Sequence, residues 1–133
     1  GDAKWFIQQA RDYGCEREVF GRPIARNQGI QFPIARAYSA MRSAELMLNE
    51  AFRMYEAGQN PGEEANLAKL QSADASWQAA EACIQTFGGF GFATEYNIER
   101  KYREARLYQV APISTNLILS YIAEHVLKMP RSY

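Results

Sequence analysis

Few residues in this chain have the type and spacing that chemistry requires. The sequence holds one histidine, His125, and the residue three positions before it is Ile122. A di-iron centre in a helical protein needs paired Glu-x-x-His motifs, so the sequence excludes that centre. The two cysteines, Cys15 and Cys83, stand far apart and outside any CxxC motif. We therefore predict no metal site and two reduced thiols.

A glycine-rich segment, residues 88–91, is the next candidate. No Lys-Ser or Lys-Thr pair follows it, so it is no P-loop, and it follows a helical pattern, so it is no Rossmann fingerprint. Taken alone, the segment predicts a helix stop followed by close backbone packing. The charged run at residues 99–106 mixes both signs, which is typical of a solvated or paired helix face.

The bulk composition is that of one globular domain. The 133 residues are 47% hydrophobic and 23% charged, which supplies a core. Fifteen basic residues balance fifteen acidic ones, which argues against nucleic acid or an anionic membrane as a partner. Two isolated, reduced cysteines are typical of an intracellular protein, which we therefore expect. No stretch is apolar enough for a membrane span, and no signal peptide opens the chain. Because the sequence starts within an amphipathic pattern, we expect a piece of a longer protein.

Amphipathic patterns place these residues on helices. Apolar residues recur every three or four positions in three long tracts and again near the C-terminus, and no strand pattern competes with them. Gly58 and Gly88 end two of the tracts, and Pro130 ends the last. Long amphipathic helices joined by short loops predict an all-α fold, an antiparallel four-helix bundle of the up-and-down type. The expected helices cover residues 2–18, 27–57, 63–87 and 97–108, with a last helix capped by Ser114 or Thr115.

Glycine and proline also give local expectations. Residues 20–23 predict a plain turn between the first two helices. Pro33 lies inside the second tract and removes one backbone donor, which predicts a kink or a later helix start. Pro112 is expected to break the charged tract before the last helix.

Five motifs follow one another in a fixed order, at residues 16–28, 68–69, 85–92, 95–100 and 102–106. Together they resemble the acyl-CoA dehydrogenase family. Residues 16–24 are similar to a family segment in which an arginine precedes Phe-Gly-x-Pro-Ile and then a glutamine, here Gln28. Ala68 and Lys69 match an Ala-Lys pair. Residues 85–92 resemble a family motif in which a glutamine precedes Gly-Gly-x-Gly and an aromatic residue. Glu95-Tyr96 and Glu99-Arg100 match the family residues that follow this motif. Residues 102–106 resemble a Tyr-Arg-Asp-Ala-Arg tract. The resemblance covers about residues 2–126 and concerns the C-terminal helical domain of the family.

The resemblance implies a larger fold and a reaction. Family members are roughly three times as long as this chain, with an N-terminal helical domain, a middle β-domain and a C-terminal bundle. Only the bundle is matched, so residues 1–133 are expected to form that domain, inactive by itself. Members bind FAD non-covalently and oxidise an acyl-CoA to the 2,3-enoyl-CoA. Electrons usually leave to an electron-transfer flavoprotein. The resemblance further implies a homodimer or homotetramer in the bacterial cytoplasm or the mitochondrial matrix.

The resemblance also implies which residues contact FAD. The arginine at the position of Arg17 reaches the FAD pyrophosphate of the neighbouring subunit, where a guanidinium suits phosphate oxygens. Residues 85–89 line the adenosine end of FAD, and residues 114–116 contact it near its reactive part. Without the resemblance, Arg17 would be interpreted as a surface arginine and Gln85 as a polar helix end. The predicted FAD-binding residues are Arg17, Gln28, Gln85, Thr86, Phe87, Gly88, Gly89, Ser114, Thr115 and Asn116.

The catalytic base departs from the family pattern. Many members carry a glutamate shortly after the tract matched by residues 102–106, and Pro112 stands at that position here. Proline cannot take a proton, and other branches place the base on the helix that would precede Gly1. Glu104 lies eight residues before Pro112 and Glu124 twelve after it, which does not suggest hydrogen-bond reach of the same atom. We therefore expect no residue of this chain to be the base.

A second interpretation keeps the fold without the chemistry. In it, the chain is a flavin-free helical oligomerisation module. A flavin absorption band in the purified protein would favour the enzyme over this module.

We also expect the bundle to self-associate, because its aromatic residues would leave adhesive surface on a lone domain. The aromatic set is Phe87, Phe90, Phe92 and Tyr96.

Overall fold

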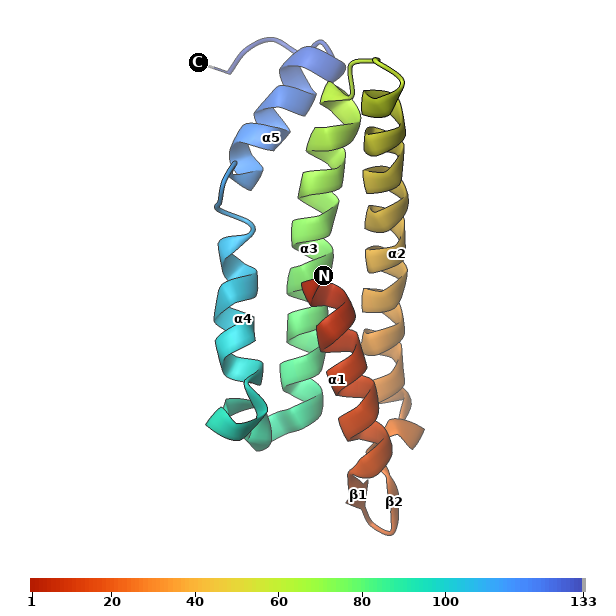
Figure 1. Cartoon of the computed structure of the whole chain (residues 1–133). Coiled ribbons are helices and arrows are strands. Elements are labelled where there is room, and N and C mark those ends of the chain that lie inside the picture. Colours follow the sequence, from red (N-terminus) through yellow and green to blue (C-terminus); the bar gives the residue numbers. More distant parts are fainter. Residues whose placement is uncertain (133) are drawn as a thin grey trace.

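A computed structural model describes residues 1–132 and shows a helical bundle (Figure 1). Its helices form four columns that run alternately down and up in this view: α1, α2, α3, and a last column made of α4 and α5. The predicted antiparallel four-helix bundle is therefore confirmed, with the fourth column divided by the loop at residues 108–114. The elements are α1 (Asp2–Glu16), β1 (Glu18–Val19), β2 (Arg22–Pro23), η1 (Ile24–Arg26), α2 (Gln28–Glu56), α3 (Gly62–Phe87), η2 (Gly88–Phe92), η3 (Thr94–Tyr96), α4 (Ile98–Leu107), α5 (Thr115–Tyr121) and η4 (Ile122–Val126).

Helix α3 is the centre of the bundle. It packs against α1, α2, α4 and α5, so it is buried on several faces rather than along one stripe. Alanines occupy many of its contact positions, and a small side chain lets neighbouring helices approach closely. The largest side chains that are fully buried are Phe6, Ile98, Ile118 and Cys83. Burying one side chain such as Phe6 stabilises the fold by about 1.5–3 kcal/mol.

The connection between α1 and α2 differs from the expected plain turn. Helix α1 ends at Glu16, two residues earlier than predicted, and β1 pairs with β2 as a short antiparallel hairpin. Phe20 and Gly21 form its tip with φ values of 53° and 73°, which suits the two-residue turns of hairpins. The sequence showed no strand pattern here, because two-residue strands are too short to show an alternating pattern.

The boundaries of α2 and α3 lie within one residue of those expected. Helix α2 begins at Gln28, five residues before Pro33, so the proline does not delay the helix start. Gly58 follows α2 with a φ of 69°, and Gly88 follows α3 with a φ of 58°. Both glycines thus end their helices in a backbone conformation that other residues rarely adopt.

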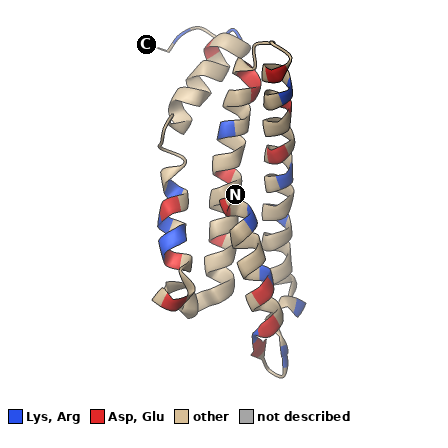
Figure 2. Cartoon of the chain, viewed as in Figure 1, with Lys and Arg blue, Asp and Glu red and all other residues tan. Residues whose placement is uncertain are grey.

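The bounds of α4 also lie within one residue of those expected, but the role predicted for Pro112 differs. Helix α4 ends at Leu107, five residues before Pro112, so that proline is not its breaker. Of the two candidate caps of α5, Ser114 is the one whose Oγ accepts a hydrogen bond, from Leu117 N at 3.3 Å. Helix α4 carries acidic and basic residues along its length, whereas α5 carries none (Figure 2).

Candidate functional site

Arg17 stands where α1 ends, and its backbone N–H donates to Tyr13 O at 2.8 Å. The guanidinium carbon lies 5.7 Å from the centre of the Phe90 ring, so the cation packs over an aromatic face. Arg17 is exposed and forms no ion pair with any residue among 1–132. Its charge is therefore available to an anion.

The glycine turn, residues 88–91, follows α3 and lies beside Arg17. Gly88 has a φ of 58° and a ψ of −133°, which turns the chain into η2. A Cβ on Gly91 would lie 3.0 Å from Ile84 Cγ1 and 3.1 Å from Ile84 O, so close packing requires that glycine. A Cβ on Gly89 would meet nothing within 4 Å. Gly91 is thus a packing residue, whereas Gly89 presents open backbone.

Arg17 and the glycine turn share an open cavity of about 500 Å³. Its floor is aromatic, because Tyr13 stacks on Phe87 with ring centres 4.1 Å apart. Thr86 is buried, and its hydroxyl donates to Ala82 O at 2.7 Å, so this hydrogen bond lies within α3. A cavity with one free cation, an aromatic floor and accessible backbone suits a phosphate linked to a planar base. The lining residues are Tyr13, Arg17, Val19, Ile24, Thr86, Phe87, Gly89 and Phe90.

The structure brings together only part of the predicted FAD-binding set. Arg17, Thr86, Phe87 and Gly89 line this cavity, whereas Gln28, Gln85 and Gly88 do not. Gln28 is exposed as the first residue of α2, and Gln85 is exposed in the last turn of α3. Sequence reasoning missed four lining residues, because nothing in their local pattern separates a cavity wall from a core. They are Tyr13, Val19, Ile24 and Phe90.

Ser114, Thr115 and Asn116 lie apart from this cavity, beyond α4. The ten residues of α4 separate the glycine turn and its short helices from the loop before α5, and ten residues of α-helix span about 15 Å. Ser114 caps α5, and Thr115 Oγ1 donates to Gln109 O at 3.1 Å. Asn116 is exposed, and its side chain forms no hydrogen bond within residues 1–132. The predicted contacts therefore form two separate groups.

A second cavity, of about 430 Å³, opens beside Pro112. Its walls are mostly apolar and come from α1, α2, α3 and the loop before α5. Two carboxylates also line it, Asp2 and Glu45, and sequence reasoning missed both. They are distant from Pro112 along the chain, and no local pattern predicts that they approach it.

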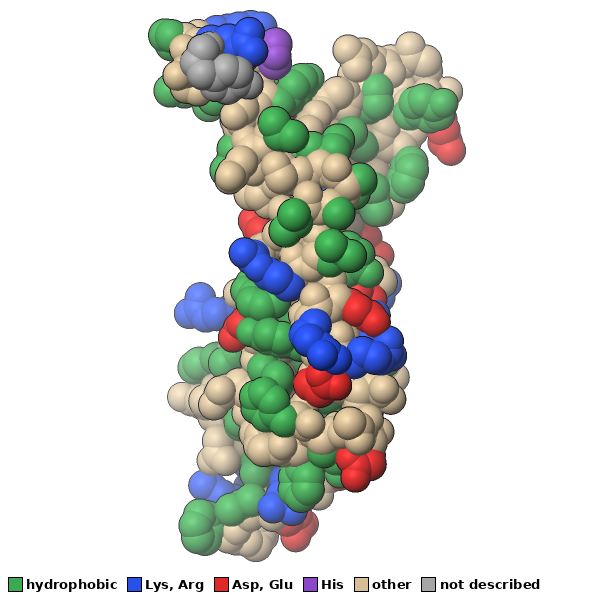
Figure 3. Space-filling model, turned by 90° about the vertical axis from the view of Figure 1, so that its left-hand side faces the viewer, with side chains coloured by type: hydrophobic (Ala, Val, Ile, Leu, Met, Phe, Trp, Pro, Cys, Tyr) green, Lys and Arg blue, Asp and Glu red, His purple; other side chains and the backbone are tan. Residues whose placement is uncertain are grey.

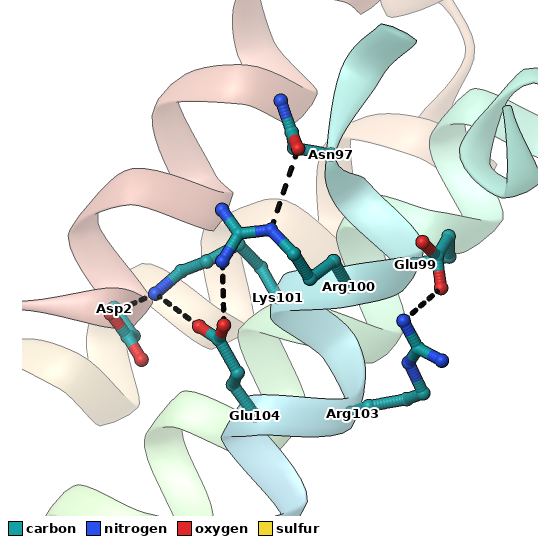
Figure 4. Close-up of polar contacts among 7 residues, drawn as sticks. All are labelled: Asp2, Asn97, Glu99, Arg100, Lys101, Arg103 and Glu104. Carbon is teal, nitrogen blue, oxygen red and sulfur yellow. Dashed lines mark hydrogen bonds and ion pairs between the residues drawn. The ribbon is translucent and has the colours of Figure 1, made fainter. Parts of the chain in front are cut away.

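Both carboxylates of this second cavity are engaged by cations. Lys101 Nζ lies 2.9 Å from Asp2 Oδ1 (Figure 4). Burial opposes the charge of Asp2, but hydrogen bonds from Lys101 and Tyr108 outweigh it and lower the pKa of Asp2. A hydrogen bond from Lys4, at 3.2 Å, lowers the pKa of Glu45. A carboxylate with a lowered pKa is a weaker base, so neither is suited to take a proton from carbon.

Two further kinds of functional feature are absent among residues 1–132. Among residues 1–132, no group of three or more His, Cys, Asp or Glu side chains is arranged to hold a metal ion. No helix in the described part of the chain is long and apolar enough to cross a membrane.

Comparison with known proteins identifies the family. The family model described as acyl-CoA dehydrogenase, C-terminal domain, matches residues 1–127. An acyl-CoA dehydrogenase of Mycobacterium tuberculosis is 36% identical over 135 residues, which is 100% of this chain and 35% of that protein. The mitochondrial short-chain specific acyl-CoA dehydrogenase of Sus scrofa is 36% identical over 124 residues, 92% of this chain and 30% of that protein. The chain thus spans about a third of the length of these curated relatives.

Solved structures agree with the sequence matches. Butyryl-CoA dehydrogenase from Megasphaera elsdenii superposes with a TM-score of 0.90 at 25% identity, covering 94% of this chain and 33% of that one. A glutaryl-coenzyme A dehydrogenase in complex with glutaryl-CoA superposes with a TM-score of 0.87 at 26% identity, covering 98% and 33%. Together with the family model, they show that this chain belongs to the acyl-CoA dehydrogenase family and matches its C-terminal domain.

Proposed function

We propose that residues 1–133 form the C-terminal domain of a longer, FAD-dependent acyl-CoA dehydrogenase that oxidises an acyl-CoA to the 2,3-enoyl-CoA. Tyr133 lies outside the described residues. The observation that carries the proposal is the cavity that Arg17, which has no ion-pair partner among residues 1–132, lines together with Gly89 and Phe90. When bound, FAD accepts the hydride of this oxidation.

The residues of the Arg17 cavity fit the dinucleotide part of FAD. Arg17 offers parallel N–H donors to the pyrophosphate oxygens and has no competing carboxylate among residues 1–132. Gly89 has no side chain, so a ligand can approach its backbone. The stacked rings of Tyr13 and Phe87 supply an apolar floor for the adenosine. Gln28 and Gln85 are exposed near the ends of their helices, and in this proposal they contribute further contacts to FAD.

The two groups of predicted contacts suggest that one domain contacts two FAD molecules. Arg17 and residues 85–89 would serve the FAD of the neighbouring subunit, whereas residues 114–116 would serve the reactive part of the subunit's own FAD. This arrangement requires a homodimer, itself able to pair into a tetramer. Hydrophobic side chains reach the surface on the face formed by α4 and α5 (Figure 3). The large exposed ones of α4, α5 and the loop between them are Leu107, Tyr108, Val110, Ile113, Leu117 and Leu119.

The catalytic base would come from outside this chain. Pro112 cannot ionise, and the two carboxylates that share its cavity, Asp2 and Glu45, have lowered pKa values. A glutamate on the segment that precedes Gly1 in the longer protein is therefore our proposal for the base. We further propose an electron-transfer flavoprotein as the electron acceptor, and the bacterial cytoplasm or the mitochondrial matrix as the location.

The test is flavin retention by the full-length protein. Arg17→Ala should raise the Kd for FAD about 10- to 100-fold, because a charge-assisted hydrogen bond contributes about 1.5–3 kcal/mol. Arg53→Ala is the matched control, since Arg53 is an exposed arginine paired only with Glu50 on α2. Equal FAD affinity in both variants would overturn the assignment of Arg17. A full-length protein that binds no flavin at all would instead favour the oligomerisation module.

A further inference from the structure

Two charged side chains of α3 hold the loop between α4 and α5. Lys69 Nζ donates to the backbone carbonyl of Tyr108. Five residues further along α3, Asp74 Oδ1 accepts a hydrogen bond from Gln109 Nε2 at 3.1 Å. Neither Lys69 nor Asp74 forms an ion pair within residues 1–132. The side chains of Lys69 and Asp74 are thus directed at this loop rather than at each other or at neighbouring helices.

Lys69 contacts the loop at a favourable place. Tyr108 directly follows the last residue of α4, where carbonyl groups lack helical partners and carry the negative end of the helix dipole. A lysine ammonium there satisfies one carbonyl and is stabilised by the dipole. Lys69 also lines the cavity beside Pro112, together with the loop residues Tyr108 and Ala111.

Asp74 acts on the start of α5 through one intermediate residue. The side chain of Gln109 is held by Asp74, and the carbonyl of Gln109 accepts two hydrogen bonds from Thr115, from N at 3.0 Å and from Oγ1 at 3.1 Å. The neighbouring Ser114 caps α5. A continuous set of hydrogen bonds therefore runs from α3 through Gln109 to the first turn of α5.

We propose that Lys69 and Asp74 are positioning residues, which hold the loop at residues 108–114 so that Ser114, Thr115 and Asn116 meet the reactive part of the flavin. The inference rests on the proposed function, because it assigns those three residues to the flavin. Neither Lys69 nor Asp74 contacts the cofactor in this proposal. Their effect arises because a small displacement of a positioned group slows a reaction strongly.

The first test measures the loop itself, without catalysis. In the full-length protein, Lys69→Met and Asp74→Ala should each speed amide hydrogen exchange across residues 108–116 at least about tenfold, since the loop loses an anchor. Lys69→Arg and Asp74→Asn, which keep a donor and an acceptor, should restore most of the protection. Lys128→Met is the matched control, because Lys128 also donates to a backbone carbonyl, that of His125, but away from this loop. Unchanged exchange in Lys69→Met and Asp74→Ala would overturn the inference.

The second test measures flavin reduction by acyl-CoA. Lys69→Met and Asp74→Ala should lower the rate constant of reduction about 10- to 100-fold, with FAD still bound, because the Arg17 cavity is untouched. Lys128→Met should reduce flavin at the wild-type rate. A wild-type rate in both α3 variants would overturn the positioning role. If the wild-type protein itself fails to reduce flavin with acyl-CoA, the proposed function is wrong, and the exchange experiment still decides whether α3 anchors the loop.

Discussion

Lys101 of α4 and Asp2 of α1 are 99 residues apart in the sequence, and Lys101 Nζ lies 2.9 Å from Asp2 Oδ1 (Figure 4). Only 19% of the Lys101 side chain and 20% of the Asp2 side chain are exposed. Lys101 also lies 3.2 Å from Glu104 Oε2, so one ammonium joins two carboxylates. The contact fastens the fourth column to the start of α1.

We expect the pair to make stability depend on pH. The folded-state pKa of Asp2 lies below its ordinary value of 3.8, so its contribution is present above that value and disappears as pH falls through the folded pKa. The hydrogen bond with Asp2 raises the pKa of Lys101 above 10.5, so the ammonium stays charged throughout this range. At pH 7, Asp2→Asn should lower the free energy of unfolding by about 1 kcal/mol, allowing for solvent screening. As pH falls, the variant should lose less stability than wild type. Urea denaturation between pH 2.5 and pH 7 checks this.

Glu50→Gln is the control for that experiment, because Glu50 pairs with Arg53 on one exposed helix face. It should leave the free energy of unfolding at pH 7 almost unchanged. If the stability of Asp2→Asn falls with decreasing pH as steeply as that of wild type, the role of Asp2 is contradicted.

Two glycines of the same turn should respond oppositely to alanine. Gly91→Ala should lower the free energy of unfolding by about 1–3 kcal/mol, because its Cβ would press on Ile84 and its backbone carbonyl. Gly89→Ala should leave stability nearly unchanged, since its Cβ meets nothing within 4 Å, and should instead weaken FAD binding in the full-length protein. Thermal unfolding and flavin titration separate the two effects. Equal stability losses at both positions would contradict the assigned roles.

The two cysteines should differ in reactivity. Cys83 is fully buried, and burial raises the pKa of its thiol to about 12. Cys15 is exposed. Because the thiolate is the reactive form, a thiol reagent at pH 8 should modify Cys15 in the folded protein and Cys83 only after denaturation. Mass spectrometry of the modified peptides checks this, and Cys15→Ser should remove the reaction of the folded protein. Rapid labelling of Cys83 in that variant would show that the core opens.

The proposal that no residue of this chain is the catalytic base can be tested with four substitutions. Asp2→Asn, Glu45→Gln, Glu104→Gln and Glu124→Gln should each leave flavin reduction by acyl-CoA within about threefold of wild type, because none is expected to take the proton. Replacing the proposed glutamate upstream of Gly1 should abolish reduction while FAD stays bound. Stopped-flow absorbance of the flavin is the measurement. Loss of reduction in any one of the four, with FAD retained, would identify that residue as the base instead.

Self-association should depend on the exposed aromatic residues near the glycine turn. Phe87 does not belong to that surface, contrary to expectation, because it is buried against Tyr13. Phe92 is 70% exposed, so Phe92→Glu should shift the protein toward monomer in sedimentation velocity. Tyr55, which is 73% exposed in the last turn of α2, provides the control variant Tyr55→Glu. A wild-type protein that stays monomeric at high concentration would contradict the prediction.

The sequence by itself determined the helices, their order and the family. Apolar spacing of three and four residues is a local property, and glycine or proline ends a helix within one turn, so the bounds of α2 and α3 were predicted to within one residue. The hairpin at Phe20 and Gly21 was not predicted, because its pairing needs only two residues on each side.

Only the tertiary structure decided which predicted residues meet. It placed Arg17 beside Gly89 in one cavity, set Ser114 to Asn116 apart from them, and brought Asp2 to the wall that contains Pro112. It also directed Lys69 to the carbonyl of Tyr108, 39 residues away. Local periodicity carries no information on such contacts, because they depend on how far each helix extends and on the angle and register at which α3 packs against its neighbours.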